Sequence, residues 1–437
     1  MNEGGKGLTY RVVVLSLALL AGLAPLPAAP AAAQGQGAGQ APAQGRPEFV
    51  EDELLVLFKR QVPAAAQATA HANANARVVR EVRGLDVKVV QVPPARLANA
   101  LQRYQQDPTV EYAEMNPVAY PDGMPNDASF GQQWALHNTG QNGGRADADI
   151  DAPAAWDVPA PAGATPATIS IADTGIDAGH PDLAGKVVEQ RNWYDGGGTA
   201  DVYNHGTHVA GIAAAATGNG IGIAGVCPEC TVINAKVCSD AGSCPHDRIA
   251  NGVLWSVGCE ERLPDPPGGL GECVGTNRSQ VINMSLSSTA GSTTLQRALD
   301  RAAQRGATMA CAAGNNGNSR ATYPASYAAC IAVAGTTSQD GKYRLSTTGT
   351  WVSVAAPADP ILSTVPGGGY AHKSGTSMAA PHVAGLAGLL RSRGVATTRD
   401  AVRGRIESTA DRIAGTGRDW SNGRINACRA MTGAGTC

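Results

Sequence analysis

The sequence contains few aromatic and few charged residues for its length. Only 3 Phe occur in 437 residues, against 54 Gly, and charged residues make up 16% of the chain. A hydrophobic core therefore has to be packed closely from Ala, Val, Ile and Leu. The net charge of −2 provides no basic stripe of the kind that nucleic-acid binding requires. We accordingly expect no nucleic-acid partner.

Long apolar runs are also scarce, and the clearest extends from Val12 to Leu23. Lys6 and Arg11 precede it, and residues 31–33 are small residues suited to a cleavage site. The run is shorter than the roughly 20 residues that a membrane-spanning helix needs. Residues 1–33 are therefore predicted to be a signal peptide, and no later segment is expected to cross a membrane. These features predict a secreted, extracellular protein.

The remaining chain is too long for one ordinary domain, and its composition changes along its length. Residues 34–47, rich in Gly, Ala, Gln and Pro, are predicted to be a flexible linker. Residues 48–121 form a second unit of strand patterns and one helix with a proline in its first turn. In this unit we expect strands at 53–59, 77–82, 87–92 and 109–113, and a helix at 94–105.

Strand and helix patterns alternate after residue 122. Such alternation predicts an α/β domain, over residues 122–437, with a parallel sheet covered on both faces. The expected strands are 168–172, 231–237, 280–284 and 307–312, and the expected helices are 246–257 and 294–305.

A serine near the C-terminus has the setting that a nucleophile requires. Ser377 follows Gly375 and Thr376 at the predicted start of a helix, in which Gly385 and Gly388 permit close packing. A nucleophilic hydroxyl needs a rigid exposed position, a base and a donor-lined pocket for the oxyanion. The same pattern in isolation also fits an ordinary Ser N-cap on a core helix.

Three other segments provide candidates for the remaining roles. Asp173 follows the strand pattern 168–172, at the sheet edge where open α/β sheets build their sites. His205 lies in a Gly-containing turn that opens into an Ala-rich helix. Asn315 follows a small-residue strand and is a candidate donor to an oxyanion. Each residue also fits a structural role, as a turn or cap residue or as an ordinary buried histidine.

The segments around Asp173, His205, Asn315 and Ser377 resemble the four signature blocks of the subtilisin-like serine proteases, especially the thermitase-like branch. The resemblance extends over residues 125–430, and the order carboxylate, imidazole, hydroxyl is that of subtilisin. It implies a three-layer α/β domain with a parallel sheet. It also implies that Ser377 attacks the scissile carbonyl, His205 moves the proton and Asp173 orients the imidazole. Asn315 and the Ser377 backbone N–H would then bind the oxyanion.

Residues 48–121 resemble the propeptide of subtilisin-like zymogens. The resemblance implies a small α+β domain that assists folding and acts as an intramolecular inhibitor. Self-cleavage is then expected around residues 118–124. An unrelated accessory domain is the alternative, since this unit carries no catalytic motif. The implied protein is a monomeric serine endopeptidase that hydrolyses polypeptide substrates through an acyl-enzyme intermediate.

The resemblance also implies one structural calcium ion. Its ligands in the family are carboxylates, an amide and backbone carbonyls, which suit a hard cation. The matching residues are Asp127, Asp182, Ala216, Asn219, Ile221 and Ile223. The alternative is that 217–222 is a simple Gly-rich loop. The family's second calcium loop is shortened here, between Arg191 and Asn204, and no second ion is predicted.

In the family, an extended peptide pairs with strand segments on both sides of the cleft. The matching segments are 241–244 and 285–287. The predicted substrate contacts are Ser285, Ser287, Gly314, Asn316 and Thr322. Ser287 and Ser288 stand where the family usually has glycines, and Cys244 replaces a small residue, so we expect a narrower or more polar cleft. No charged residue is among the contacts around the residue preceding the cut, so no strong charge selection is implied there.

The ten cysteines all follow residue 33. Export favours disulfides over free thiols. Neighbour pairing would join Cys227 with Cys230, Cys238 with Cys244, Cys259 with Cys273, Cys311 with Cys330, and Cys428 with Cys437. Sequence alone does not establish this connectivity, and a zinc site that uses the first four cysteines is the alternative.

Other classes of protein fit these motifs less well. Asp173-Thr174-Gly175 resembles an aspartic-protease signature, but no second copy occurs. The spacing of His205 and His208 differs from that of a zinc-protease helix, which also requires a Glu. Ser377 does not lie in a Gly-x-Ser-x-Gly motif, which argues against a lipase or esterase. A catalytically inactive binding or scaffold protein on a protease fold is the remaining alternative, yet no triad residue is missing.

Overall fold

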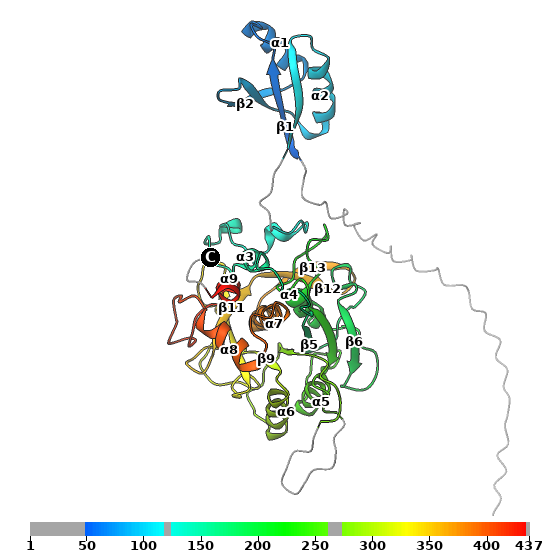
Figure 1. The fold of residues 1–437 in the computed structure, drawn as a ribbon, viewed down its shortest axis with the longest axis vertical. Helices are drawn as coiled ribbons and strands as arrows, with labels where there is room; N and C mark the ends of the chain where they lie inside the picture. The colour runs from blue at the N-terminus through cyan, green and yellow to red at the C-terminus, as the bar shows by residue number, and fades with distance from the viewer. Residues whose placement is uncertain (1–48, 118–123, 261–272, 434–437) are drawn as a thin grey trace, which may run out of the picture. The chain divides into compact units, whose positions relative to one another are not determined.

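The computed structural model describes residues 49–117, 124–260 and 273–433, and its elements are labelled in Figure 1. The predicted linker and the boundary at 118–123 lie outside the described residues. So do the predicted signal peptide and Cys437.

The N-terminal unit is a small α+β domain. Its antiparallel sheet has the strand order β2-β3-β1-β4. The elements are β1 (Phe49–Phe58), α1 (Ala64–Asn73), β2 (Arg77–Val82), β3 (Val87–Gln91), α2 (Leu97–Gln106) and β4 (Val110–Pro117). All four predicted strands and the proline-led helix are confirmed, with a 3-10 turn over Pro94–Arg96 before α2. Helix α1 was not predicted, because its Ala-rich sequence buries only Ala70 and so lacks an apolar stripe.

The second unit is built on a seven-stranded sheet with the order β11-β10-β9-β8-β5-β7-β6. All of its strand pairs are parallel. The strands are β5 (Thr168–Asp173), β6 (Val187–Asn192), β7 (Thr231–Lys236), β8 (Val281–Met284), β9 (Thr308–Ala312), β10 (Cys330–Thr337) and β11 (Val354–Asp359). The predicted α/β class and parallel sheet are therefore correct.

Helices cover both faces of this sheet, which gives three layers (Figure 1). On one side are α4 (Gly206–Ala214) and α7 (Thr376–Ser392), and on the other are α5 (His246–Ser256) and α6 (Thr293–Gln304). Val281 and Ile282 are successive residues of β8, and their side chains belong to the two opposite cores. The smaller elements are α3 (Ala152–Trp156), β12 (Ile361–Val365), β13 (Gly369–Lys373), α8 (Arg399–Ser408) and α9 (Ala427–Thr432).

Helix α7 packs against its neighbours at very short distances. A Cβ atom added at Gly385 would lie 2.6 Å from Val226 Cβ, and one added at Gly388 would lie 2.6 Å from Cys230 Sγ. Real Cβ atoms do not approach this closely, so glycine is required at both positions. Helix α7, whose first turn contains Ser377, is therefore held rigidly.

The structure contains the first four of the predicted disulfides, Cys227–Cys230, Cys238–Cys244, Cys259–Cys273 and Cys311–Cys330. Cys428 is also disulfide-bonded, but its predicted partner lies outside the described residues. The alternative of a zinc site is wrong, because the four sulfur atoms that it needs form two disulfides.

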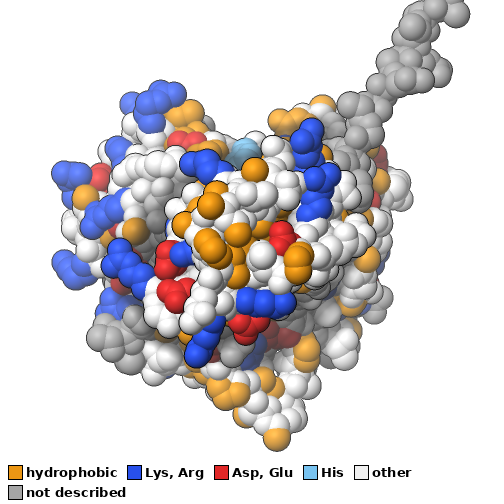
Figure 2. All heavy atoms as spheres, turned by 90° about the horizontal axis from the view of Figure 1, so that it is seen from above, with side chains coloured by type: hydrophobic (Ala, Val, Ile, Leu, Met, Phe, Trp, Pro, Cys, Tyr) orange, Lys and Arg blue, Asp and Glu red, His pale blue; other side chains and the backbone are white. Residues whose placement is uncertain are grey.

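None of the helices in the described part of the chain is long and apolar enough to span a bilayer. On the face seen in Figure 2, Lys and Arg side chains are interspersed with Asp and Glu side chains.

Candidate active site

Asp173 is placed by the end of a central parallel strand. It is the last residue of β5, and β5 lies between β7 and β8 in the sheet. Its side chain is only 3% exposed, and its Oδ1 accepts hydrogen bonds from His205 Nδ1 at 2.7 Å and from the Thr174 backbone N–H at 2.8 Å. The other oxygen, Oδ2, is buried without a hydrogen-bond partner in the described structure. The carboxylate is thus held in one orientation, with Oδ1 hydrogen-bonded to the imidazole.

His205 directly precedes α4, and the start of this helix lies against Asp173. A Cβ atom at Gly206 would be 2.2 Å from the Gly175 carbonyl oxygen and 3.1 Å from Asp173 Cβ. Only glycine allows this approach, which brings the imidazole to the carboxylate. His208, one turn later, is fully buried, and its Nε2–H donates to the Ala371 carbonyl at 2.9 Å. Burial lowers the pKa of His208 to about 3, so this second histidine is a neutral structural residue.

A second carboxylate joins the two segments that carry Asp173 and His205. Asp201 Oδ1 accepts from Thr174 Oγ1 and from the Asn204 backbone N–H, both at 2.8 Å. Its Oδ2 accepts from the Thr207 backbone N–H at 2.9 Å. No motif in the sequence marks Asp201, since an Asp in a loop before a helix is ordinarily a turn or cap residue.

The charges around His205 shift its pKa. Burial of the ring lowers the pKa, but the charge and hydrogen bond of Asp173 raise it more strongly, and Asp201 adds to this effect while Lys373 opposes it. The resulting pKa of His205 lies above the ordinary value of a histidine. The site therefore stabilises an imidazolium, as is needed in a group that accepts a proton during a reaction.

Ser377 lies in the first turn of α7, where its backbone N–H has no intrahelical acceptor. Its Oγ donates to the Ser285 carbonyl at 3.1 Å, and Ser285 Oγ donates to the Ser377 carbonyl at 2.8 Å. This carbonyl is available because Pro381, four residues later in the helix, has no N–H to donate to it. Ser285 and Ser377 thus hold each other across the cleft.

Asn315 is oriented by the residue beside Ser377. Its Oδ1 accepts from the Thr376 backbone N–H at 2.9 Å and from Thr376 Oγ1 at 3.2 Å. The amide oxygen is thereby fixed, and the Nδ2 group is left as a donor on an exposed side chain. Two donors, Asn315 Nδ2 and the Ser377 N–H, are therefore available near the start of α7.

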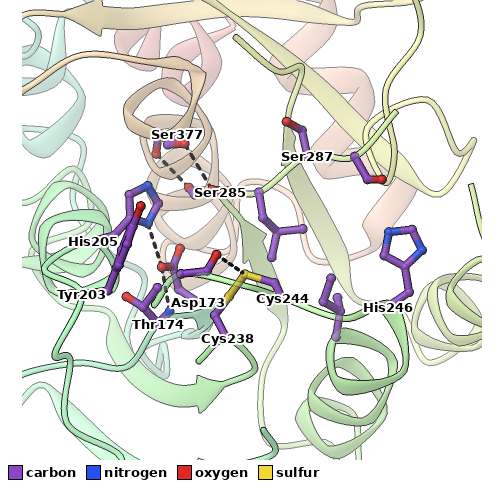
Figure 3. Close-up of a pocket in the computed structure, with 14 residues that line it drawn as sticks. Asp173, Thr174, Tyr203, His205, Cys238, Cys244, His246, Ser285, Ser287 and Ser377 are labelled. Atoms are coloured by element: carbon purple, nitrogen blue, oxygen red, sulfur yellow. Dashed lines mark hydrogen bonds and ion pairs between the residues drawn. A yellow bond between two sulfur atoms is a disulfide. The ribbon is translucent and has the colours of Figure 1, made fainter. Parts of the chain in front are cut away.

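Asp173, His205 and Ser377 line one pocket, together with Ser285 and Ser287 (Figure 3). The pocket also contains residues that our sequence analysis did not assign to the site. These are Tyr203, His246 and Cys238, among others, and Cys238 forms a disulfide with Cys244, which was predicted to border the cleft. No local motif distinguished them, because their place depends on how loops meet across the sheet edge.

Comparisons with known proteins agree with this geometry. The family model described as "Subtilase family" matches residues 165–435. The chain belongs to the subtilase family. A second model, "Fervidolysin N-terminal prodomain", matches residues 35–116. The chain is thus a subtilisin-like serine endopeptidase that acts on polypeptides and carries an inhibitory prodomain.

Several curated subtilases are similar over most of their length. Thermitase from Thermoactinomyces vulgaris is 44% identical over 283 residues, which cover 64% of this chain and 93% of that protein. A thermophilic serine proteinase from a Bacillus species is 37% identical over 386 residues, 88% of each chain. Subtilisin E from Bacillus subtilis is 34% identical over 391 residues, 86% of this chain and 89% of the other. A solved protease structure from Pseudoalteromonas arctica aligns with a TM-score of 0.59 and 27% identity, covering 71% of this chain and 99% of that chain.

The remaining predicted substrate residues of this subtilase are Gly314, Asn316 and Thr322. A Cβ atom at Gly314 would be 3.1 Å from Thr322 Cγ2 and 3.3 Å from Ser287 Oγ, so these three residues are neighbours. Asn316 is exposed, and its backbone N–H donates to Thr347 Oγ1 at 3.2 Å. Gly314 and Asn316 therefore both lie against Thr347, and Gly314 also lies near Ser287 of the pocket.

The predicted calcium residues of the subtilase are also brought together. Asp127 and Asp182 are both buried, and the loop after α4 donates backbone N–H groups to them, from Gly218 at 2.7 Å and from Ile223 at 2.8 Å. Asn219 Nδ2 donates to Asp182 Oδ1 at 2.9 Å. Asp127 Oδ1 is buried and has no hydrogen-bond partner in the described structure.

The electrostatics of this pair favour a cation. Burial raises the pKa of Asp127, its backbone hydrogen bonds oppose this, and the charge of Asp182 adds to the rise. An ionised buried pair of carboxylates is costly unless a positive charge compensates for it. The orphan oxygen of Asp127, the second carboxylate and the carbonyl-rich loop form an oxygen-only set that suits calcium. Ala216, Ile221 and Ile223 would contribute their carbonyls.

Proposed function

We propose that this subtilase is a secreted endopeptidase that is made as a self-processing zymogen and works through an acyl-enzyme. The observation that carries the proposal is the short Asp173–His205 hydrogen bond in the same pocket as Ser377, with two free donors beside it. An Asp–His pair with only a structural role would not need a serine hydroxyl and oxyanion donors nearby, so their presence favours a catalytic role.

The first step would begin with a rotation of the Ser377 side chain. Its Oγ turns away from the Ser285 carbonyl and towards His205, as substrate binding tightens contacts that are loose in the free enzyme. Ser377 Oγ then attacks the scissile carbonyl carbon while His205 accepts its proton. Asp173 stabilises the imidazolium through the 2.7 Å hydrogen bond.

The negative oxygen of the tetrahedral intermediate would accept hydrogen bonds from Asn315 Nδ2 and the Ser377 N–H. His205 next protonates the leaving amine, and the first product departs. A water molecule, deprotonated by the same imidazole, then hydrolyses the ester on Ser377. The second product leaves, and the hydroxyl and neutral imidazole are restored.

The proposal divides the chain into four parts. Residues 1–33 would be the signal peptide, 34–47 a linker, 48–121 the inhibitory propeptide and 122–437 the peptidase domain. The propeptide assignment is supported by the compact α+β unit and by the matching prodomain model over residues 35–116. Export is supported by the disulfides, which persist in oxidising compartments.

A calcium ion would stabilise the peptidase domain without taking part in the reaction. Asp127, Asp182 and Asn219 would hold it together with the loop carbonyls, and its charge would compensate for the two buried carboxylates. The support is the orphan Asp127 Oδ1 and the raised pKa of that group.

Covalent labelling tests the nucleophile. A fluorophosphonate probe should modify the mature protein on Ser377, because the hydroxyl is activated by His205. Ser377→Ala should abolish labelling and peptide hydrolysis. Ser374→Ala, which removes a nearby exposed hydroxyl, should leave both intact. An unlabelled wild-type protein would instead support an inactive scaffold.

Self-processing is tested with the same variant. Expressed alone, Ser377→Ala should accumulate as unprocessed precursor. Normal maturation of this variant would show that another protease makes the cut, and the self-processing part of the proposal would then be wrong.

A further inference from the structure

The pocket that contains the triad extends well beyond it. Its volume is about 300 Å³, and it runs between the loop that precedes α5 and the segment that follows β8 (Figure 3). Ser285, Gly314 and Thr322 are the predicted contacts around the residue preceding the cut, so under the proposed function an extended substrate continues between these two segments. The far part of the pocket then receives a side chain further upstream in the substrate.

The sides of this far part are apolar. Ile249 of α5 and Leu286 line it, and Ile249 is 1% exposed. The Cys238–Cys244 disulfide forms another side. Two backbone N–H groups, of Val237 and Cys238, donate to the Asp173 carbonyl at 2.9 and 3.2 Å, so this side is anchored to the catalytic strand. The walls thus suit the methylene groups of a flexible side chain.

The end of the pocket is polar. His246 lies there, away from His205 and Asp173, as Figure 3 shows. Its half-buried ring makes no hydrogen bond or ion pair with any described residue. Ser288 also lines the pocket, and its Oγ accepts the Ala290 N–H at 3.1 Å, so its own proton is available to donate. Unused donors at the end of an apolar channel call for an acceptor on the substrate.

The local charges favour an anionic acceptor. His246 is the first residue of α5, and within the described structure the backbone N–H groups of His246 and Asp247 have no acceptor. The start of this 11-residue helix therefore carries positive potential. Asp247 is 63% exposed and paired with Arg248 at 3.4 Å, and Asp240 is paired with Lys236 at 2.8 Å.

We propose that His246 determines a preference for substrates with a glutamate upstream of the residue that precedes the scissile bond. The methylenes would pack against Ile249 and Leu286. The carboxylate would accept hydrogen bonds from His246 and Ser288 at the start of α5. This inference rests on the proposed function and adds a substrate class to it.

The test uses peptides that differ at one upstream position. Three matched series carry Glu, Gln or Leu at the second, third or fourth residue before the cut, and kcat/KM is measured for each. In one of these series the Glu peptide should exceed the Leu peptide by about fivefold, the effect of one charge-assisted hydrogen bond at a partly exposed site. Gln should fall between them.

Variants identify the residue responsible. His246→Phe keeps a ring but removes the donors, and should make kcat/KM equal for the Glu and Leu peptides. His246→Lys should retain the preference. His137→Phe, a half-buried histidine that does not line this pocket, is the matched control and should change nothing. Fluorophosphonate labelling of each variant verifies that the catalytic groups are intact.

The outcomes separate the two proposals. If the wild-type enzyme cleaves none of the peptides and is not labelled, the proposed function itself is wrong. If it cleaves them without favouring Glu, or if His246→Phe keeps the preference, the inference about His246 is overturned. An equal loss on all peptides in His246→Phe would also overturn it, because it would indicate a structural role.

Discussion

At the scale of single residues, the site depends on groups that hold the catalytic ones in place. Asp201 takes three hydrogen bonds, from Thr174, Asn204 and Thr207. Through them it connects the end of β5 with the start of α4. We therefore consider Asp201 a positioning residue, because it acts on Asp173 and His205 without contact with the substrate.

Replacing Asp201 by Asn tests this role through the pH profile. His205 has to be neutral to accept a proton, so kcat/KM falls as the pH drops through its pKa, which Asp173 and Asp201 raise. Removing the Asp201 charge lowers this pKa, and the acidic limb of the profile should move to lower pH. We also expect about a tenfold lower kcat with little change in KM, since a misplaced imidazole weakens proton transfer.

The control for this experiment is Asp195→Asn, in the preceding loop. Asp195 accepts hydrogen bonds from Asn192 and Gly197 and does not contribute to the pKa of His205. Its profile should be that of the wild type. An unchanged profile in Asp201→Asn as well would contradict the positioning role.

At the scale of secondary-structure elements, the geometry depends on how closely helix starts approach strand ends. The start of α4 meets the end of β5 at Gly206, and the start of α7 carries Ser377 with the backbone N–H proposed as an oxyanion donor. Both contacts lie at the carboxyl edge of the parallel sheet. Small residues at these positions are therefore a condition for the site and not only for packing.

Gly206→Ala should separate the imidazole from Asp173. The added Cβ would meet the Gly175 carbonyl at 2.2 Å, so α4 has to shift. A displacement of about 1 Å costs roughly 100-fold in rate, and we expect at least this loss in kcat/KM.

Gly404→Ala is the control: this glycine lies within α8 with open space around it. The control should keep full activity and gain up to about 1 kcal/mol of stability from helix propensity. Wild-type kinetics in Gly206→Ala would show that the contact is not tight.

At the scale of the whole molecule, residues far apart in the chain close the peptidase domain. The Ala427 N–H donates to the Ile150 carbonyl at 2.7 Å. Buried Arg424 is paired with Asp340 at 2.7 Å and with Asp411 at 2.8 Å. Separating a buried ion pair leaves an uncompensated buried charge, which is costly. These contacts therefore hold the C-terminal segment firmly on the domain.

Calcium should stabilise this domain in a pH-dependent way. The folded-state pKa of Asp127 is raised, so without a cation this group makes the folded state less stable as pH increases above its unfolded value of 3.8. Calcium binds the ionised form and reverses this effect. In inhibited protein, saturating calcium should raise Tm by about 5 °C near neutral pH and by less at about pH 4.5.

Asp127→Asn should remove most of this calcium-dependent shift, whereas Asp195→Asn should retain it. Thermal unfolding with and without chelator measures both variants. A calcium shift that survives in Asp127→Asn, or that disappears in Asp195→Asn, would place the ion elsewhere.

The sequence by itself was enough to predict the fold class and to nominate the candidate residues of the site. Parallel strands bury both faces and so appear as short apolar runs, and Asp173, His205, Asn315 and Ser377 each follow or precede such an element in a recognisable local pattern. The neighbour pairing of four disulfides was also correct, because short loops bring their ends together whatever the surrounding fold.

Only the tertiary structure decided which other residues meet at the site. Asp201 reaches Thr174 across 27 residues, and His246 shares a pocket with Ser288 and Ser377. Such neighbours depend on strand order and on how loops pack at the sheet edge, and no periodicity in the chain encodes them. Local chemistry thus nominated the candidate catalytic groups, whereas long-range packing decided which residues support them and which line the pocket.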